Sequence, residues 1–148
     1  MLLDPTNDWP GEILAISTDG KVVTGTHAYD GFYWSEADGM KTLGGISGQP
    51  EMQAAYPNAI AQDGALIFGA YGDPWQTIPI AFVWTAADGM RSLQDVATAA
   101  GITIPEGVSL ANVMAASTDG SVLLGWAYDG EGATVSFVLR LPVSAYGL

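Results

Sequence analysis

Three copies of a tyrosine–aspartate grouping are the residues of this sequence best suited to bind a ligand. Each grouping follows an apolar segment that ends close to a glycine. Aromatic rings pack on the C–H faces of sugars, and carboxylates accept hydrogen bonds from sugar hydroxyls. The same residue types are also common in turns, so turns that bind nothing are the alternative. The candidate ligand-binding residues are Tyr29, Asp30, Tyr71, Asp73, Trp75, Tyr128 and Asp129.

Paired carboxylates would give a different chemistry, the hydrolysis of glycosidic bonds. Such an enzyme needs two carboxyl groups that face each other about 5 to 9 Å apart. The glutamates stand in no repeated or motif-like setting, so no catalytic residue is assigned. A glycosidase-like hydrolase, with carboxylates assembled only by the fold, is kept as the alternative to a non-enzymatic module. The glutamates are Glu12, Glu36, Glu51, Glu106 and Glu131.

Metal and cofactor sites have no recognisable pattern in this chain. His27 is the single histidine and there is no cysteine, which excludes the usual zinc ligand sets. Calcium needs roughly six to eight oxygens converging on one point, and single aspartates in successive turns do not supply them. We therefore expect no metal and no cofactor.

The net charge of the chain bears on which classes of partner it can bind. Sixteen acidic residues against four basic ones give a net charge of −12. Such a surface repels nucleic acid phosphates and anionic lipid headgroups. The longest apolar stretch, residues 78–87, is interrupted by Pro79 and Thr85 and is too short to span a bilayer. We expect neither nucleic acid binding nor membrane insertion.

The elements that must position the tyrosines and aspartates are repeated hairpins. Residues 15–25, 59–69 and 115–125 align without gaps, each with an apolar strand, an Asp-Gly pair, a second apolar strand and a closing glycine. Asp-Gly is a strong hairpin signal because hairpin turns need positive φ angles. The closing glycines predict a bulge or a close approach of two backbones. They are Gly25, Gly69 and Gly125.

A third and a fourth strand follow each hairpin in the first two copies. Residues 32–35 and 82–85 alternate aromatic and smaller side chains, which predicts a half-buried strand with Trp34 and Trp84 in the core. A second Asp-Gly turn and a short strand come next. The third copy has only the third strand, residues 137–140, and ends near Pro142. Residues 1–4 resemble the fourth strand of the second copy and are a candidate for the missing strand.

Little helix is expected between these strands. Residues 92–101 are rich in alanine and predict one or two helical turns closed by Gly101. A second helical insert is predicted from Glu51 to Ala55, ending before Pro57.

The repeated pattern resembles the HAF-type extracellular repeat family of bacteria. The resemblance rests on the Ser/Ala-x-Asp-Gly turn, the Val-Val-x-Gly strand, Phe-x-Trp, and Asp-Gly-Met-x-x-Leu, and covers most of residues 12–142. It implies export and a propeller-like tandem architecture, and it implies no reaction. The third copy departs from the pattern, because Leu139 and Arg140 replace the Trp-Ser/Thr pair.

The sequence therefore predicts one all-β domain, residues 1–148, of three tandem four-stranded antiparallel repeats in a β-propeller-like arrangement. The repeats span about residues 12–45, 56–95 and 112–142. Three blades leave unpaired edges, since propellers close with about four to eight blades. The chain would then belong to a longer repeat array, form a six-bladed homo-oligomer, or adopt a three-fold β-trefoil or β-prism as the alternative fold.

The function predicted on this basis is a non-enzymatic extracellular repeat module with a structural or interaction role. Carbohydrate is a candidate ligand, and a glycan or a protein is the expected partner. The resemblance implies a secreted or cell-surface location, although residues 1–5 carry no signal-peptide pattern.

Overall fold

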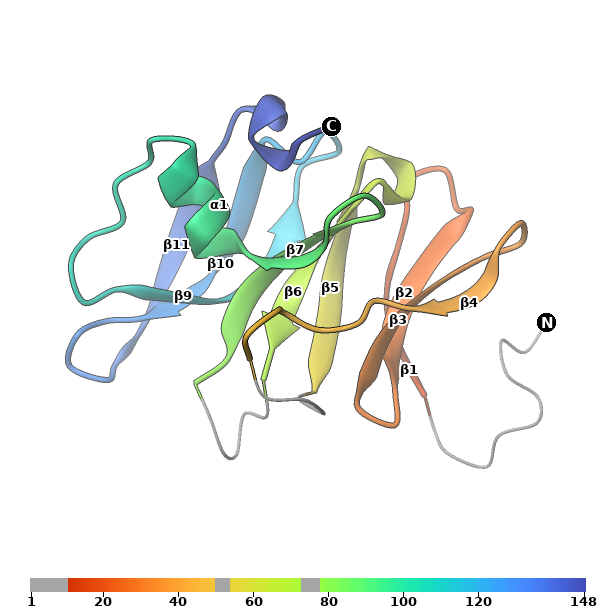
Figure 1. The fold of residues 1–148 in the computed structure, drawn as a ribbon, viewed down its shortest axis with the longest axis horizontal. Helices are drawn as coiled ribbons and strands as arrows, with labels where there is room; N and C mark the ends of the chain where they lie inside the picture. The colour runs from red at the N-terminus through yellow and green to blue at the C-terminus, as the bar shows by residue number, and fades with distance from the viewer. Residues whose placement is uncertain (1–10, 50–53, 73–77) are drawn as a thin grey trace.

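The structure is a computed structural model that describes residues 11–49, 54–72 and 78–148. Eleven strands in these ranges form three antiparallel sheets (Figure 1). The first sheet contains β1 (Glu12–Ile16), β2 (Val22–His27), β3 (Asp30–Ser35) and β4 (Gly39–Thr42), in that order. The middle sheet contains β5 (Ala55–Ala61), β6 (Leu66–Tyr71), β7 (Ile80–Thr85) and β8 (Gly89–Ser92), also in chain order.

The third sheet has three strands in the described residues, one fewer than the four predicted for each repeat, since the third copy lacks the second Asp-Gly turn and the strand that follows it. They are β9 (Ser109–Ala116), β10 (Val122–Tyr128) and β11 (Thr134–Arg140), with β10 in the centre. The prediction of an all-β fold made of three repeated antiparallel units is therefore confirmed. The proposal that residues 1–4 supply a fourth strand falls outside the described residues.

The first and third Asp-Gly turns are built by the same side-chain bonds. Ser17 Oγ donates to Asp19 Oδ1 over 2.6 Å and accepts from the Val22 N–H over 2.9 Å. Asp19 Oδ1 also accepts from the Lys21 N–H. Ser117, Asp119 and Val122 repeat this pattern with distances of 2.8 and 3.0 Å. These aspartates thus serve the turns, as expected from their position next to glycine.

The middle turn differs because Ala61 stands where the other two copies have serine. Without that hydroxyl the turn forms a short 3₁₀ segment, η1 (Gln62–Gly64), in which Gln62 and Asp63 have φ angles of 48° and 53°. Its backbone is held by the third copy instead, since the Gln62 N–H donates to the Thr118 carbonyl over 2.7 Å.

A β-bulge lies opposite each closing glycine, as predicted. The register of β1 and β2 shifts between Ile13 and Ala15, so one extra residue opposes Gly25. A Cβ at Gly25 would overlap the Glu12 carbonyl oxygen on the neighbouring strand. A Cβ at either of the other two glycines would likewise overlap a carbonyl oxygen of its own neighbouring strand. Only glycine permits this approach of two strands. The residues skipped opposite these glycines are Leu14, Asn58 and Met114, and β9 has a second skipped residue at Ala111.

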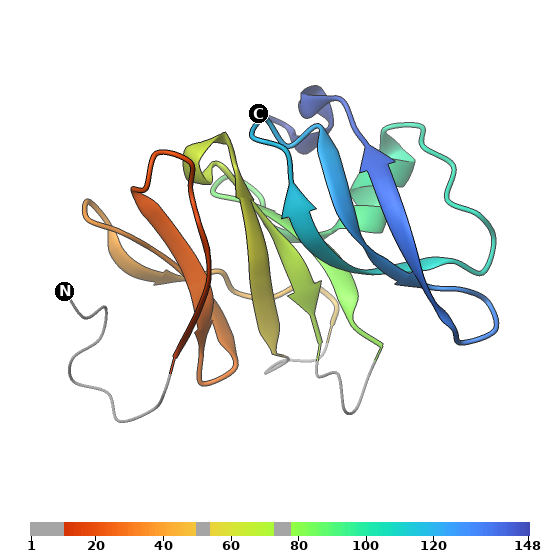
Figure 2. The same ribbon diagram turned by 180° about the vertical axis from the view of Figure 1, so that it is seen from behind.

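The three sheets stack face to face with the middle sheet between the other two (Figures 1 and 2). β5 packs over β1 and β2, and β9 packs over β5, β6 and β7. Consecutive residues of β6 therefore face opposite neighbours: Ile67 lies in the cluster against the first sheet, and Phe68 in the cluster against the third. Double-sided packing explains why every residue of β6 is buried.

The two predicted helical segments have different outcomes. α1 (Leu93–Ala99) is present, begins with Ser92 accepting from the Asp95 N–H, and is followed by Gly101 with φ +87°. The predicted helix at Glu51 to Ala55 is wrong at its described end. Ala55 starts β5, where it pairs with Tyr71 and donates its N–H to the Tyr29 carbonyl. Strand pairing with β6 therefore outweighs the local helical preference.

The stack is open. The first and third sheets lie on opposite sides of the middle one, and within the described ranges no sheet closes on itself (Figure 2). The described sheets thus form neither a closed propeller nor a closed three-fold fold. Among the described residues no helix has the length and apolar character needed to cross a bilayer.

Candidate functional site

The loops that carry the tyrosine–aspartate groupings leave from one end of the three sheets. The β2–β3 and β10–β11 connections lie along the lower edge in Figure 1, opposite the Asp-Gly turns, and β6 ends and β7 begins at the same edge. The three strands that precede the groupings therefore end on the same side of the stack. Asp73 and Trp75, however, lie outside the described residues.

Tyr29 is the candidate that is most accessible. Its side chain is 72% exposed and sits in a two-residue turn in which Ala28 and Tyr29 have φ angles of 50° and 74°. Non-glycine residues rarely adopt this conformation. The Tyr29 carbonyl accepts the Ala55 N–H over 3.0 Å, which anchors the turn to the middle sheet. Asp30, also exposed, begins β3 beside it.

Tyr71 lies in the core rather than on the loop edge. It is 5% exposed and belongs to the cluster between the first and middle sheets, with Leu43 and Trp84. Gly45 runs so close that a Cβ there would lie 2.5 Å from the Tyr71 hydroxyl oxygen. The ring has no face free for a sugar.

Tyr128 contacts another aromatic ring, and Asp129 forms hydrogen bonds within a turn. Tyr128 packs edge to face on Trp126, with 5.4 Å between ring centroids. Asp129 Oδ1 accepts from the N–H groups of Glu131 and Ala133 at 2.8 and 2.9 Å, so its carboxylate closes the β10–β11 loop. Trp126 was not among the predicted residues. Its position two residues before Tyr128 on one strand was the available signal.

The other acidic residues are dispersed. The four described glutamates are all exposed, and His27 is half-buried at the end of β2. The described residues contain no group of three or more histidine or carboxylate side chains arranged to hold a metal. Three hydrogen bonds, from the Ser121 N–H and from the hydroxyls of Ser121 and Ser117, lower the pKa of Asp119 to about 2. The lowered pKa thus reflects hydrogen bonds within the Asp-Gly turn, because hydrogen bonds to a carboxylate favour its charged form.

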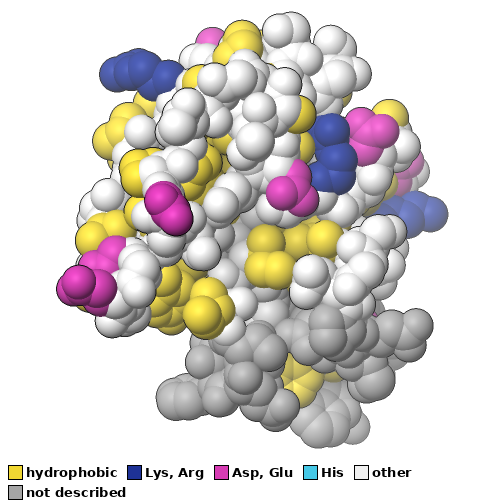
Figure 3. Space-filling view, turned by 60° about the vertical axis from the view of Figure 1, so that its left-hand side comes forward, with side chains coloured by type: hydrophobic (Ala, Val, Ile, Leu, Met, Phe, Trp, Pro, Cys, Tyr) yellow, Lys and Arg dark blue, Asp and Glu magenta, His cyan; other side chains and the backbone are white. Residues whose placement is uncertain are grey.

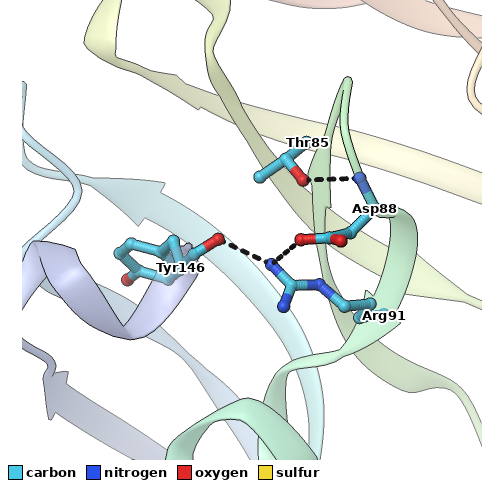
Figure 4. A network of polar contacts seen from close by, with 4 residues as sticks. All are labelled: Thr85, Asp88, Arg91 and Tyr146. Carbon is cyan, nitrogen blue, oxygen red and sulfur yellow. Dashed lines mark hydrogen bonds and ion pairs between the residues drawn. The ribbon is translucent and has the colours of Figure 1, made fainter. Parts of the chain in front are cut away.

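A polar network joins the middle sheet to the C-terminal turn η2 (Val143–Tyr146) (Figure 4). Arg91 donates to the Tyr146 carbonyl over 2.9 Å and pairs with Asp88 at 3.6 Å, while the Asp88 N–H donates to Thr85. A hollow of about 580 Å³ lies beside it, between β8, α1 and η2. Because the Arg91 head group already has these two partners, the network fastens η2 rather than presenting a free cation.

The outer face of the third sheet is an exposed apolar surface. Leu124 is 47% and Val138 62% exposed, and the two are cross-strand partners. Ala115 pairs with Leu124 on the other side, and Trp126 lies on the same face two residues along β10. We call Ala115, Leu124, Trp126 and Val138 the third-sheet face. Figure 3 turns this end of the molecule forward and shows several hydrophobic patches with acidic and basic side chains scattered among them.

Comparison with the middle sheet shows what the equivalent residues do in another copy of the repeat. Leu124 is equivalent to Phe68, and Val138 to Val83, in the aligned copies. Both middle-sheet residues are completely buried, because the third sheet covers them. The third-sheet face is thus the surface that receives the next sheet elsewhere in the chain.

The first sheet has a matching surface on its far side. Cross-strand pairs there form one row over four strands, and the equivalent row of the middle sheet packs toward the first sheet. The two rows have nearly identical composition. We call the first the outer row and the second the covered row: Ile16, Val23, Trp34 and Met40 form the outer row, and Ile60, Ile67, Trp84 and Met90 the covered row.

Burial separates the two rows. Trp84 is 9% exposed and stacks on Tyr33, as predicted for a core tryptophan, whereas Trp34 is half-buried and Ile16 is 63% exposed. The candidate site is therefore a pair of outer sheet faces together with the loop edge at Tyr29. No protein-family model, curated protein or solved structure matches the chain.

Proposed function

We propose that this chain is a non-enzymatic repeat module that packs against further sheets of the same design in a propeller-like array. The observation that carries this proposal is the outer row. It repeats the residue types of the covered row, yet no sheet of the described chain covers it. Exposed apolar surfaces of this kind mark interaction sites.

The arrangement of the strands supports a radial array. β1, β5 and β9 are each the first strand of their sheet, and β5 lies against both of the others. In a propeller, successive four-stranded sheets pack in this way around a central axis. The resemblance to the HAF-type repeats supports the same architecture and a secreted or cell-surface location.

A tandem fusion of two full chains tests this function. If the outer row receives a neighbouring sheet, Val138→Glu in the first copy places a charge in the new junction and lowers the melting temperature of the fusion. Ile78→Glu in the same copy is the matched control, because Ile78 is 62% exposed and lies on neither outer face. Equal melting temperatures for the two variants would contradict the proposal.

Carbohydrate binding at the loop edge is a second candidate, favoured by the exposed ring of Tyr29. A tyrosine face held in a constrained turn is a stacking platform with little entropy left to lose. On a glycan array, Tyr29→Ala would abolish binding and Tyr71→Phe, at a buried position, would retain it. Binding that survives Tyr29→Ala places the ligand elsewhere. Turnover of chromogenic glycosides by the unmodified chain would instead favour the hydrolase alternative.

A further inference from the structure

We infer that the third-sheet face is covered by the outer row of a second copy of this chain, in a head-to-tail contact. The inference rests on the proposed function and adds the identity of the neighbouring sheet. Two such contacts would join two copies, each with three sheets, into one ring. The resulting number of blades lies within the range of about four to eight in which propellers close.

The contacts inside the chain provide the template. At the first junction, Trp84 of the covered row packs on Tyr33 with 5.2 Å between ring centroids. Trp34 is equivalent to Trp84, and Val138 is equivalent to Tyr33. Trp34 of a second copy would therefore lie over Val138.

Both junctions inside the chain join unlike faces. The side that carries Tyr33 in the first sheet meets the covered row of the middle sheet, and the side that carries Val83 meets the row of Leu123 and Leu139 in the third. A contact between two third-sheet faces has no counterpart in the molecule. A head-to-tail contact continues the junction already present twice, so it is the arrangement that the repeat favours.

The two rows proposed to meet are apolar. Thr24, the first-sheet equivalent of Leu124, is buried and donates to the Pro57 carbonyl across the first junction. Leu124 replaces that hydroxyl with an apolar side chain, and the outer row contains no charged residue. This side of the third sheet also carries Arg140, which is exposed two residues beyond Val138, at the position where Thr85 of the middle sheet is buried.

Analytical ultracentrifugation of the full chain and three variants tests the inference. The unmodified chain should sediment as two copies, Ile16→Glu and Val138→Glu should each sediment as one, and Ile78→Glu should behave as the unmodified chain. The three substituted side chains have nearly equal exposure, at 63, 62 and 62%. Circular dichroism confirms that each variant remains folded.

Mixing the variants identifies the geometry. An equimolar mixture of Ile16→Glu and Val138→Glu retains one intact pair of faces and should recover a two-copy species. If Ile16→Glu alone still forms dimers, the contact joins two third-sheet faces and the inference is overturned. A monomeric unmodified chain also overturns it. In that case the tandem fusion decides about the repeat module. If Val138→Glu lowers the melting temperature of the fusion more than Ile78→Glu does, the proposed function stands without the dimer. If the two variants melt at the same temperature, the proposed function and the dimer are both rejected.

Discussion

The hydroxyl of Tyr146 donates a 2.6 Å hydrogen bond to the carbonyl of Gly120, and both groups are buried. This contact ties the C-terminal turn to the third Asp-Gly turn. The Tyr146 ring also packs edge to face on Phe68 of the middle sheet, with 5.6 Å between centroids. One side chain thus connects the last residues of the chain to the turn and to the core.

Replacing Tyr146 by phenylalanine keeps the ring and leaves the Gly120 carbonyl without its partner. We expect the free energy of unfolding to fall by about 1–3 kcal/mol, the cost of a buried unsatisfied polar group. Urea unfolding of both proteins measures the difference. An unchanged midpoint would show that the hydrogen bond contributes nothing net.

The same tyrosine predicts a loss of stability at high pH. Burial, with a smaller contribution from the charge of Asp119, raises the pKa of Tyr146 above its ordinary value of 10.0. The folded state therefore favours the protonated phenol, and its stabilisation is complete below pH 10 and decreases as the pH rises further. Tyr146→Phe should show a shallower decrease above pH 10. Parallel pH profiles would contradict this assignment.

Asp119 predicts the opposite behaviour in acid. Its pKa is lowered to about 2 from 3.8 by hydrogen bonds from Ser121 and Ser117. A carboxylate with a lowered folded-state pKa stabilises the protein above its unfolded value, and this stabilisation is lost as the pH falls from about 4 to about 2. Titration by NMR should show the low pKa directly. In Asp119→Asn, the free energy of unfolding should decrease less between about pH 4 and about pH 2 than in the unmodified protein.

The closing glycines should not tolerate a side chain. At Gly69 a Cβ would overlap the Tyr56 carbonyl oxygen, so Gly69→Ala forces β5 and β6 apart. We expect a loss of about 1–3 kcal/mol, as for other overpacked sites. Gly130→Ala is the control, because its φ is not positive and no atom approaches a Cβ there closer than 3.5 Å. Thermal unfolding compares the two, and equal effects would argue against the bulge as the cause.

Ionic strength should favour association of two copies. Each chain carries a net charge of −12, and the two rows proposed to meet are apolar. Repulsion between copies is screened over about 8 Å at physiological salt, while apolar burial is not weakened. The dissociation constant from sedimentation should therefore fall as salt is added. A rise would indicate that ion pairs hold the dimer.

Local structure followed from local pattern. The Asp-Gly pairs predicted hairpins because only certain residues accept positive φ angles. The closing glycines predicted bulges, and the third copy was found to lack the second Asp-Gly turn and the strand that follows it. The middle turn shows the limit of this reasoning, since Ala61 in place of serine changed the turn and let it bond to the third copy.

The sequence pattern could not predict which residues of the candidate site are exposed. Tyr29 and Tyr71 belong to similar groupings, yet one ring is exposed and the other is in the core. Trp34 and Trp84 occupy equivalent places, yet only Trp84 is covered.

By itself, the sequence determined the hairpins, the bulges and the repeated rows of side chains, because these depend on backbone sterics and on neighbours a few residues away. The tertiary structure alone decided which rows are buried and which tyrosines reach the surface. Burial depends on which sheet stacks on which face, and that contact joins residues far apart in the chain.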